Sequence, residues 1–322
     1  MYGPWLGFTT WYYGSPVPNT ILAKAYGYDN AWYRGISPLR LPLIALSRLR
    51  AGIFSSLGPA FGGNGFGFQL FADRGVIACL VLLLVIPGCL RAWRRQDLAS
   101  LGIGGFVIVY SLYYVFAMVN VFGWYVVPLT AAAILVCAAG ADLLLRTAFL
   151  APYLKLGSRG LTVAFPSLHA ILLPVSFRAD RNIQQFVDTG NRKVIGEYLA
   201  GIMTPYQTVG CEPLGYVGYY SRRIVFDFPG LCNRKVTQFV REHRQNCNLL
   251  DMLKALRPDY LVLRPGEIEA AAAGGDGWLR RDYEVVREFR VPEARVRQLL
   301  FPESNVDLAF AVLRRKPGAP PQ

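Results

Sequence analysis

Glutamate is absent from the first 196 residues of this 322-residue chain and first occurs at Glu197. Residues 1–177 contain four acidic residues, all of them Asp, whereas residues 178–322 contain seventeen. A carboxylate is expensive to place in a lipid bilayer, so a long stretch with few of them is typical of a membrane region. The sequence therefore predicts a membrane-embedded first half and a water-exposed second half.

Four apolar runs lie in the acid-poor half, at residues 76–90, 101–119, 125–145 and, more weakly, 161–177. A helix that crosses a bilayer needs about 20 mainly apolar residues. The runs approach this length, so we expect an α-helical membrane region with three to four spans over residues 75–177. Arg and Lys flank the runs on both sides in similar numbers, and charge alone therefore does not set the orientation.

The first 74 residues are expected to form an outer loop beside this region. Within the loop, Leu39, Leu43 and Leu46 fall on one stripe at helical spacing, which predicts an amphipathic helix over residues 38–53. A helix of this kind is suited to the membrane interface. An ordinary helix that faces a protein core is the alternative.

Residues 178–316 have a different pattern, in which short apolar runs alternate with amphipathic segments. Strands that alternate with helices are typical of an α/β layer. We therefore predict a small extracytoplasmic α/β domain here, followed by a disordered Pro-rich tail at residues 317–322. The expected strands are residues 208–211, 223–228, 260–263, 283–289 and 308–313, and the expected helices include residues 183–203, 235–243 and 249–256.

A resemblance to a known family rests on motifs spread along the chain. Residues 12–20 read Tyr-Tyr-Gly-Ser-Pro-Val-Pro-Asn-Thr, with Ala23 and Lys24 shortly after them. This stretch resembles a loop of bacterial polytopic glycosyltransferases of the GT-C type, which use lipid-phosphate sugar donors. Further stretches that are similar to the family follow in the same order, at residues 122–129, 181–200, 212–231 and 256–263.

The resemblance implies a multi-pass protein of the cell (inner or plasma) membrane, with the early loop and the C-terminal domain outside the cytoplasm. It covers the later half of such an enzyme. The family also has earlier spans and a carboxylate-bearing outer loop, and no stretch of this chain resembles them. We therefore expect an N-terminally truncated enzyme or a fragment, with a separate N-terminal half as one partner, and leave open whether this chain alone is an enzyme.

The function that the resemblance implies is transfer of a sugar from a polyprenyl-phosphate donor to an envelope glycan or lipid acceptor. The alternative is a membrane-anchored protein that binds a glycan or a partner without catalysis. The expected partners are membrane lipid, the polyprenyl-phosphate sugar and the acceptor. Nucleic acid is not expected, because the chain has no zinc-finger, RRM or helix-turn-helix pattern.

Sugar transfer needs a base for the acceptor proton and cations for the departing phosphate. Asp29 is the candidate base, although an Asp close to Gly27 is also typical of an Asx turn. The basic residues either bind the phosphate or only attract anionic lipid, and the tyrosines either stack on a sugar or pack in the fold. The candidate substrate-binding residues are Lys24, Arg34, Arg40, Arg48, Tyr13, Asn19, Glu212, Tyr219 and Tyr220.

Glu212 and Asp227 flank the first two expected strands, and the ends of strands are where α/β sheets place their sites. Capping of a turn is the alternative role for both. No spacing of His, Cys or carboxylates matches a metal site, so no cofactor is expected, and a divalent metal is left as an alternative. Cysteines in this half could form one disulfide and leave one thiol; they are Cys211, Cys232 and Cys247.

Overall fold

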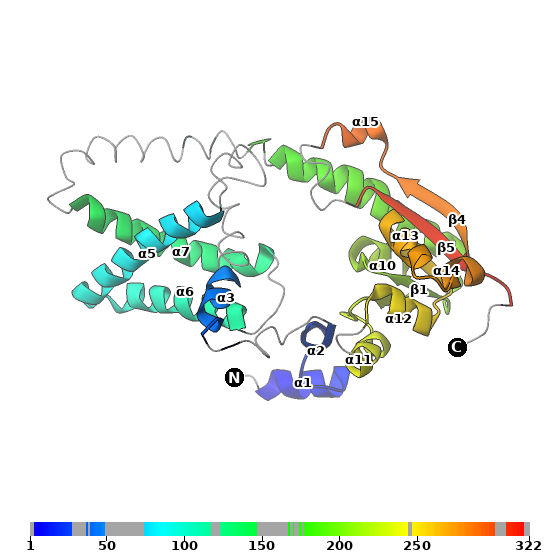
Figure 1. Cartoon of the computed structure of the whole chain (residues 1–322), viewed down its shortest axis with the longest axis horizontal. Coiled ribbons are helices and arrows are strands. Elements are labelled where there is room, and N and C mark those ends of the chain that lie inside the picture. The colour runs from blue at the N-terminus through cyan, green and yellow to red at the C-terminus, as the bar shows by residue number, and fades with distance from the viewer. Residues whose placement is uncertain are drawn as a thin grey trace. The chain divides into compact units, whose positions relative to one another are not determined.

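The structure is a computed structural model of the chain. It describes residues 3–27, 37, 39–48, 74–116, 123–146, 167, 170, 174–175, 177–243, 247–299 and 307–318. The chain divides into two compact units, one made of Met1–Asp29 with Ala179–Gln322 and the other of Asn30–Arg178. We call the first the α/β unit and the second the helical unit; Figure 1 labels most of their elements.

The helical unit contains α3 (Leu41–Arg48), α5 (Arg74–Arg95), α6 (Leu98–Phe116) and α7 (Gly123–Arg146). Its core forms around Leu129, which is 1% exposed, together with Val85 of α5 and Val107 of α6. The helices α5 and α7 approach closely because Gly140 has no side chain; a Cβ there would overlap the carbonyl oxygen of Leu84.

The prediction of three to four membrane spans is contradicted. Among the residues that the structure describes, no helix is both long enough and apolar enough to cross a membrane. The first three apolar runs instead form helices that bury some of their side chains against one another, and Arg91 of α5 forms an ion pair with Asp142 of α7. Packing between helices therefore accounts for some of the apolar residues that the sequence pattern assigned to lipid, whereas others, such as Val109 and Leu135, are exposed. Most of the fourth run, at residues 161–177, lies outside the described residues.

This finding corrects three predictions together: the α-helical membrane region as a fold class, the membrane and transmembrane description, and the multi-pass location in the cell membrane. The observed architecture is an α/β unit with a mixed five-stranded sheet, together with a helical unit. The helix predicted over residues 38–53 is observed as the shorter α3, and its location in a membrane interface stays a prediction.

The sheet of the α/β unit has the strand order β2-β1-β3-β5-β4. Its strands are β1 (Thr208–Cys211), β2 (Ile224–Asp227), β3 (Tyr260–Leu263), β4 (Tyr283–Arg290) and β5 (Ala309–Arg315). β1 pairs with β2 and β3 in parallel, whereas β5 is antiparallel to both β3 and β4. Each observed strand begins and ends within two residues of its predicted bounds, because these apolar runs are short and bounded by turn residues.

Helices cover both faces of this sheet, and β3 is buried on both sides. Tyr260 and Val262 face one core, while Leu261 and Leu263 face the other, as the alternation of side chains along a strand requires. The first core contains residues of α9 (Lys193–Ile202) and α10 (Leu214–Ser221). The second contains residues of α11 (Arg234–His243), α12 (Leu249–Leu256), α13 (Pro265–Ala273) and α14 (Trp278–Asp282). A π-helix, η3 (Gln184–Arg192), precedes α9, and α15 (Glu293–Val296) follows β4.

The N-terminal segment belongs to the α/β unit, not to the helical unit. It forms α1 (Gly3–Tyr13) and α2 (Asn19–Gly27), separated by a bend that contains Pro16 and Pro18, as the two prolines predict. α2 packs on α11, and Ala23 is fully buried in this contact region. The sequence had grouped these residues with positions up to 74 in one outer loop, and no local pattern reveals a contact with a domain 200 positions away.

Candidate functional site

The candidate site lies at the carboxyl ends of the three parallel strands. Glu212 directly follows β1, Asp227 ends β2 and Arg264 directly follows β3. Because β1, β2 and β3 are parallel neighbours, these residues come to the same edge of the sheet. Open α/β sheets place ligands at this edge.

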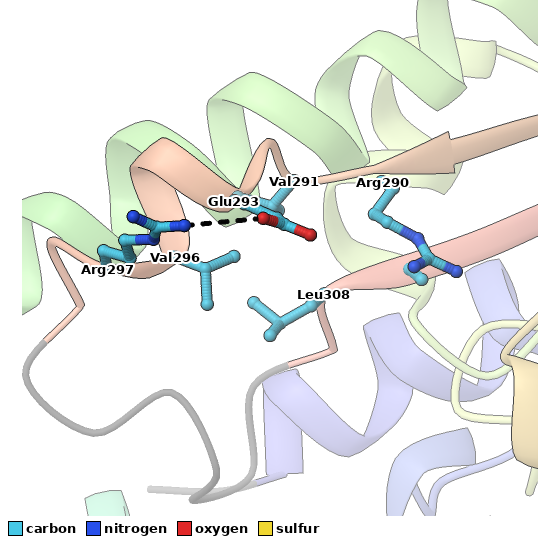
Figure 2. Close-up of a pocket in the computed structure, with 7 residues that line it drawn as sticks. Arg290, Val291, Glu293, Val296, Arg297 and Leu308 are labelled. Carbon is cyan, nitrogen blue, oxygen red and sulfur yellow. Dashed lines mark ion pairs between the residues drawn. The ribbon is translucent and has the colours of Figure 1, made fainter.

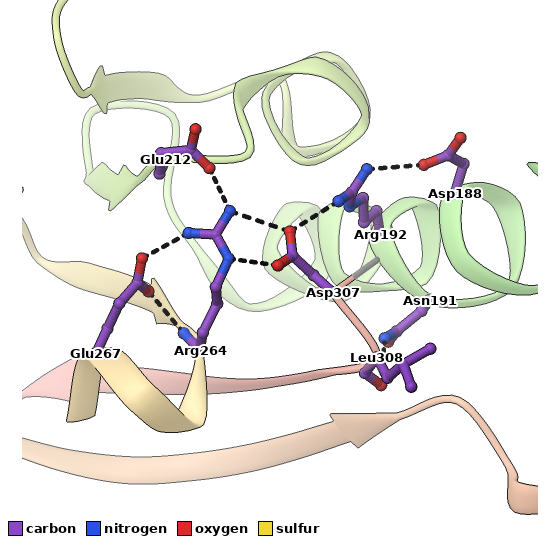
Figure 3. Close-up of polar contacts among 8 residues, drawn as sticks. All are labelled: Asp188, Asn191, Arg192, Glu212, Arg264, Glu267, Asp307 and Leu308. Carbon is purple, nitrogen blue, oxygen red and sulfur yellow. Dashed lines mark hydrogen bonds and ion pairs between the residues drawn. The ribbon is translucent and has the colours of Figure 1, made fainter. Parts of the chain in front are cut away.

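Arg264 is the centre of a network of ion pairs at this edge (Figure 3). Its guanidinium contacts Glu212, Glu267 at 2.5 Å and Asp307 at 2.6 Å. Asp307 also accepts a hydrogen bond at 2.8 Å from Arg192 of η3, and Arg192 pairs with Asp188 at 2.9 Å. The network therefore ties η3, the end of β1, the start of α13 and the segment before β5 together.

Arg264 and its carboxylate partner Asp307 shift each other's pKa in favour of the charged forms. Burial on its own lowers the pKa of Arg264, but hydrogen bonds to Asp307 and Glu212 outweigh burial and raise that pKa. Burial on its own raises the pKa of Asp307, but the hydrogen bond and charge of Arg264 lower it below the usual range. Both groups are therefore held in their charged forms, which suits a structural role more than proton transfer.

Asp227 is fully buried and holds the loop that follows β2. Its carboxylate accepts hydrogen bonds from the backbone N–H of Leu231 at 2.5 Å and of Cys232 at 3.3 Å. Burial raises the pKa of Asp227 to about 6, while these backbone hydrogen bonds act in the opposite direction. Thr237 of α11 donates from its hydroxyl to the carbonyl of Gly230 at 2.7 Å, so the loop is fixed from two sides.

The N-terminal segment docks on this same loop. The side-chain amide of Asn19 donates to the carbonyl oxygens of Gly230 at 2.6 Å and Leu231 at 3.2 Å. Arg234 lies so close to Gly14 that a Cβ at position 14 would be only 2.9 Å from the Nη1 atom of Arg234. At the far end of α2, the ring of Tyr26 lies 5.8 Å from the guanidinium of Arg241.

An aromatic cluster lies on α10, which begins two residues after Glu212. The rings of Tyr216 and Tyr220 stack with centroids 6.1 Å apart, and Tyr219 is nearly perpendicular to Tyr220 at 5.1 Å. Tyr219 is 76% exposed. The candidate site therefore has a charged part around Arg264 and an aromatic part on the following helix.

A pocket of about 370 Å³ lies elsewhere in the α/β unit, beside α15 and the start of β5 (Figure 2). Its lining is mainly apolar and includes Val291, Val296 and Leu308. Glu293 and Arg297 at its rim pair with each other at 3.7 Å. Arg290 is the third charged residue of the lining.

The structure brings some of the predicted residues together. Asn19 meets the loop after β2, and Glu212, Tyr219 and Tyr220 share one strand–helix segment. Lys24 lies partly buried on α2, next to the buried Ala23.

For the other predicted residues, the structure gives a place in an element or leaves them outside the described ranges. Arg40 is exposed and Arg48 ends α3, both in the helical unit, while Tyr13 ends α1. Asp29 and Arg34 lie outside the described residues, so the candidate base stays a prediction.

Sequence reasoning missed the residues that organise the charged part: Arg192, Arg264, Glu267 and Asp307. The one available signal was Arg264 itself, a charged residue directly after a buried strand. Its partner Asp307 is 43 positions away, and no local sequence pattern predicts that pairing.

Within the described ranges, no group of three or more His, Cys, Asp or Glu side chains could hold a metal ion. The cysteines that the structure describes are free thiols, among them Cys211, Cys232 and Cys247, so the open disulfide alternative is not observed for these three.

The fold and the site define a class: an α/β domain with a mixed sheet whose parallel carboxyl edge carries charged and aromatic residues. Residues 180–307, which make up most of this domain, match the family model described as a domain of unknown function (DUF8728). No curated protein and no solved structure matches the chain.

Proposed function

We propose that this chain takes part in the transfer of a sugar from a polyprenyl-phosphate donor to a glycan or lipid acceptor. One observation carries the proposal. The Pro-Val-Pro-Asn-Thr stretch and the stretch at residues 212–231 both resemble glycosyltransferases of the GT-C type, and they are in direct contact through Asn19 and Gly230. That contact joins residues 211 positions apart in the sequence.

The chemistry of the contact region fits a phosphate-linked donor. Departure of a polyprenyl phosphate leaves negative charge that cations must stabilise. Lys24 is carried on α2, and α11 begins with Arg234 and Lys235 on the helix against which α2 packs. Arg241 adds a further cation on the same helix. The docked segment therefore gathers positive charge beside the candidate site.

The second candidate function is binding of a glycan or a partner without catalysis. It is favoured by the fact that carboxylates at the strand edge already have hydrogen-bond or ion-pair partners. At the strand edge in the described part of the chain, Glu212, Glu267 and Asp307 are all paired with Arg264, and Asp227 accepts hydrogen bonds from the backbone. A general base needs a carboxylate that is able to accept the proton of the acceptor hydroxyl. The candidate Asp29 belongs to the part that the structure leaves undescribed.

A transfer assay separates the two candidates. The full chain would be incubated with polyprenyl-phosphate sugars that carry a labelled sugar, and with oligosaccharide acceptors. Appearance of labelled oligosaccharide that is lost in the Asp29→Asn variant supports transfer. If the chain binds the oligosaccharide but forms no product with any donor, the binding role replaces the transfer role.

A further inference from the structure

The tyrosine cluster on α10 presents an open aromatic face. Tyr219 is 76% exposed, whereas Tyr216 and Tyr220 beside it are partly buried. The planes of Tyr219 and Tyr220 meet at 81°, so the Tyr219 ring is supported by its neighbour without being covered face to face. A large ring with few rotatable bonds offers contact area at a low cost in conformational entropy.

The fold holds this cluster rigidly against α9. A Cβ at Gly196 would lie 2.8 Å from the Cβ of Tyr220 and 3.0 Å from the carbonyl of Val217, so the two helices approach closely only because position 196 is Gly. Lys193 lies over the Tyr220 ring at 5.0 Å and covers one of its faces. Tyr220 is therefore the fixed support and Tyr219 the open surface.

Charged groups border the aromatic surface and neutralise each other. Lys193 also pairs with Glu197, one helical turn further along α9, at 3.5 Å. Glu197 remains 54% exposed, which leaves carboxylate oxygens accessible to an outside donor. This pair thus offers one hydrogen-bond donor and one acceptor, and its two charges cancel.

We propose that Tyr219, with Lys193 and Glu197 at its border, forms the binding site for a neutral glycan, which is the acceptor if the proposed sugar transfer holds. A sugar ring has an apolar face of C–H groups, which buries against an aromatic ring, and hydroxyl groups at its rim, which need both donors and acceptors. A neutral glycan matches the neutral Lys193–Glu197 pair, whereas an anion or a cation would meet one like charge there. α10 connects the carboxyl end of β1 to the amino end of the parallel strand β2, and Tyr219 lies in the second half of this helix.

Direct binding tests this proposal without any sugar donor. Neutral oligosaccharides of glucose, mannose, galactose and arabinose would be titrated into the full chain by isothermal calorimetry. We expect at least one series to bind at one site per chain, and Tyr219→Ala to weaken that binding at least tenfold. Tyr219→Phe keeps the ring and should bind within threefold of wild type, and Glu197→Gln should cause an intermediate loss.

Tyr206 provides a matched control. It is a tyrosine with 89% exposure, but it lies between α9 and β1 and is not part of the tyrosine cluster on α10. Tyr206→Ala should leave binding unchanged, and circular dichroism should show that each variant is folded. The proposal is overturned if no neutral oligosaccharide binds, or if Tyr219→Ala binds as tightly as wild type. Glycan binding that depends on Tyr219 would stand even if the chain transfers no sugar, so the two proposals fail separately.

Discussion

Asn19 donates its side-chain amide to the carbonyl oxygen of Gly230 at 2.6 Å, and this bond joins the N-terminal segment to the loop that buried Asp227 holds. We expect Asn19→Ala to lower the free energy of unfolding of the α/β unit by about 1–2 kcal/mol, since it removes both hydrogen bonds of the amide. Asn19→Asp should cost more, because a carboxylate cannot donate and would face two carbonyl oxygens. Urea denaturation measures both losses, and hydrogen exchange should show faster exchange in α2. Unchanged exchange in α2 would show that the bond does not hold the segment.

Because of Asp227, we expect the free energy of unfolding to decrease as pH rises. Its pKa is raised by burial to about 6, above the value of about 3.9 expected in the unfolded chain. A carboxyl with a raised pKa stabilises the fold fully below the unfolded value and loses that contribution as pH rises through the folded value. We expect wild type to lose about 2 kcal/mol relative to Asp227→Asn between pH 4 and pH 7. Urea titrations of both proteins at intervals of one pH unit measure this difference, and a difference that is constant with pH would contradict it.

Arg264 should matter far more for stability than an exposed arginine of the same unit. Replacement by Met leaves Glu212, Glu267 and Asp307 close together without their shared cation. A fully buried pair broken in this way costs about 3–5 kcal/mol, and we expect about 2 kcal/mol here because the network is partly exposed to solvent. Arg297→Met is the control, since Arg297 and its partner Glu293 are more than 80% exposed. Equal thermal unfolding midpoints for the two variants would contradict the assigned role of Arg264.

Gly140 tests the packing of the helical unit. A side chain at position 140 would overlap the carbonyl oxygen of Leu84, so Gly140→Ala should force α5 and α7 apart and destabilise the unit by about 1–3 kcal/mol. Gly102 of α6 is the matched control, because a Cβ there meets nothing within 4 Å. Gly102→Ala should stabilise its helix by about 0.5–1 kcal/mol. Thermal unfolding followed by circular dichroism measures both variants, and the account fails if the two substitutions act in the same direction.

The sequence predicted the sheet well because the evidence for it is local. Each strand is a short apolar run between turn residues, and β3 is buried on both faces, as its unbroken Tyr-Leu-Val-Leu run indicates. The same local evidence failed for the apolar runs before residue 146. An apolar run is compatible with lipid contact and with helix packing, and hydropathy alone does not distinguish the Gly140 contact with Leu84 from a lipid-facing surface.

The candidate site was predicted only in part, for a related reason. Asn19, Glu212, Tyr219 and Tyr220 were named from short motifs; Asn19 contacts the loop after β2, Glu212 follows β1, and both tyrosines lie on α10. The ion pair between Arg264 and Asp307 joins residues 43 positions apart. The docking of α2 on α11 involves a hydrogen bond between residues 211 positions apart. Contacts at this separation follow from the sheet order, which no short stretch of sequence specifies.

Binding of polyprenyl phosphate to the full chain tests the central claim most directly. Affinity would be measured for wild type, for Lys24→Ala and for Lys254→Ala. Lys254 is a lysine of the same unit that lies on α12 and pairs with Asp276. We predict that Lys24→Ala weakens binding at least several-fold, while Lys254→Ala binds as wild type does. Equal affinities for all three proteins, or no binding at all, would contradict the proposal that the docked N-terminal segment binds the phosphate group of a sugar donor.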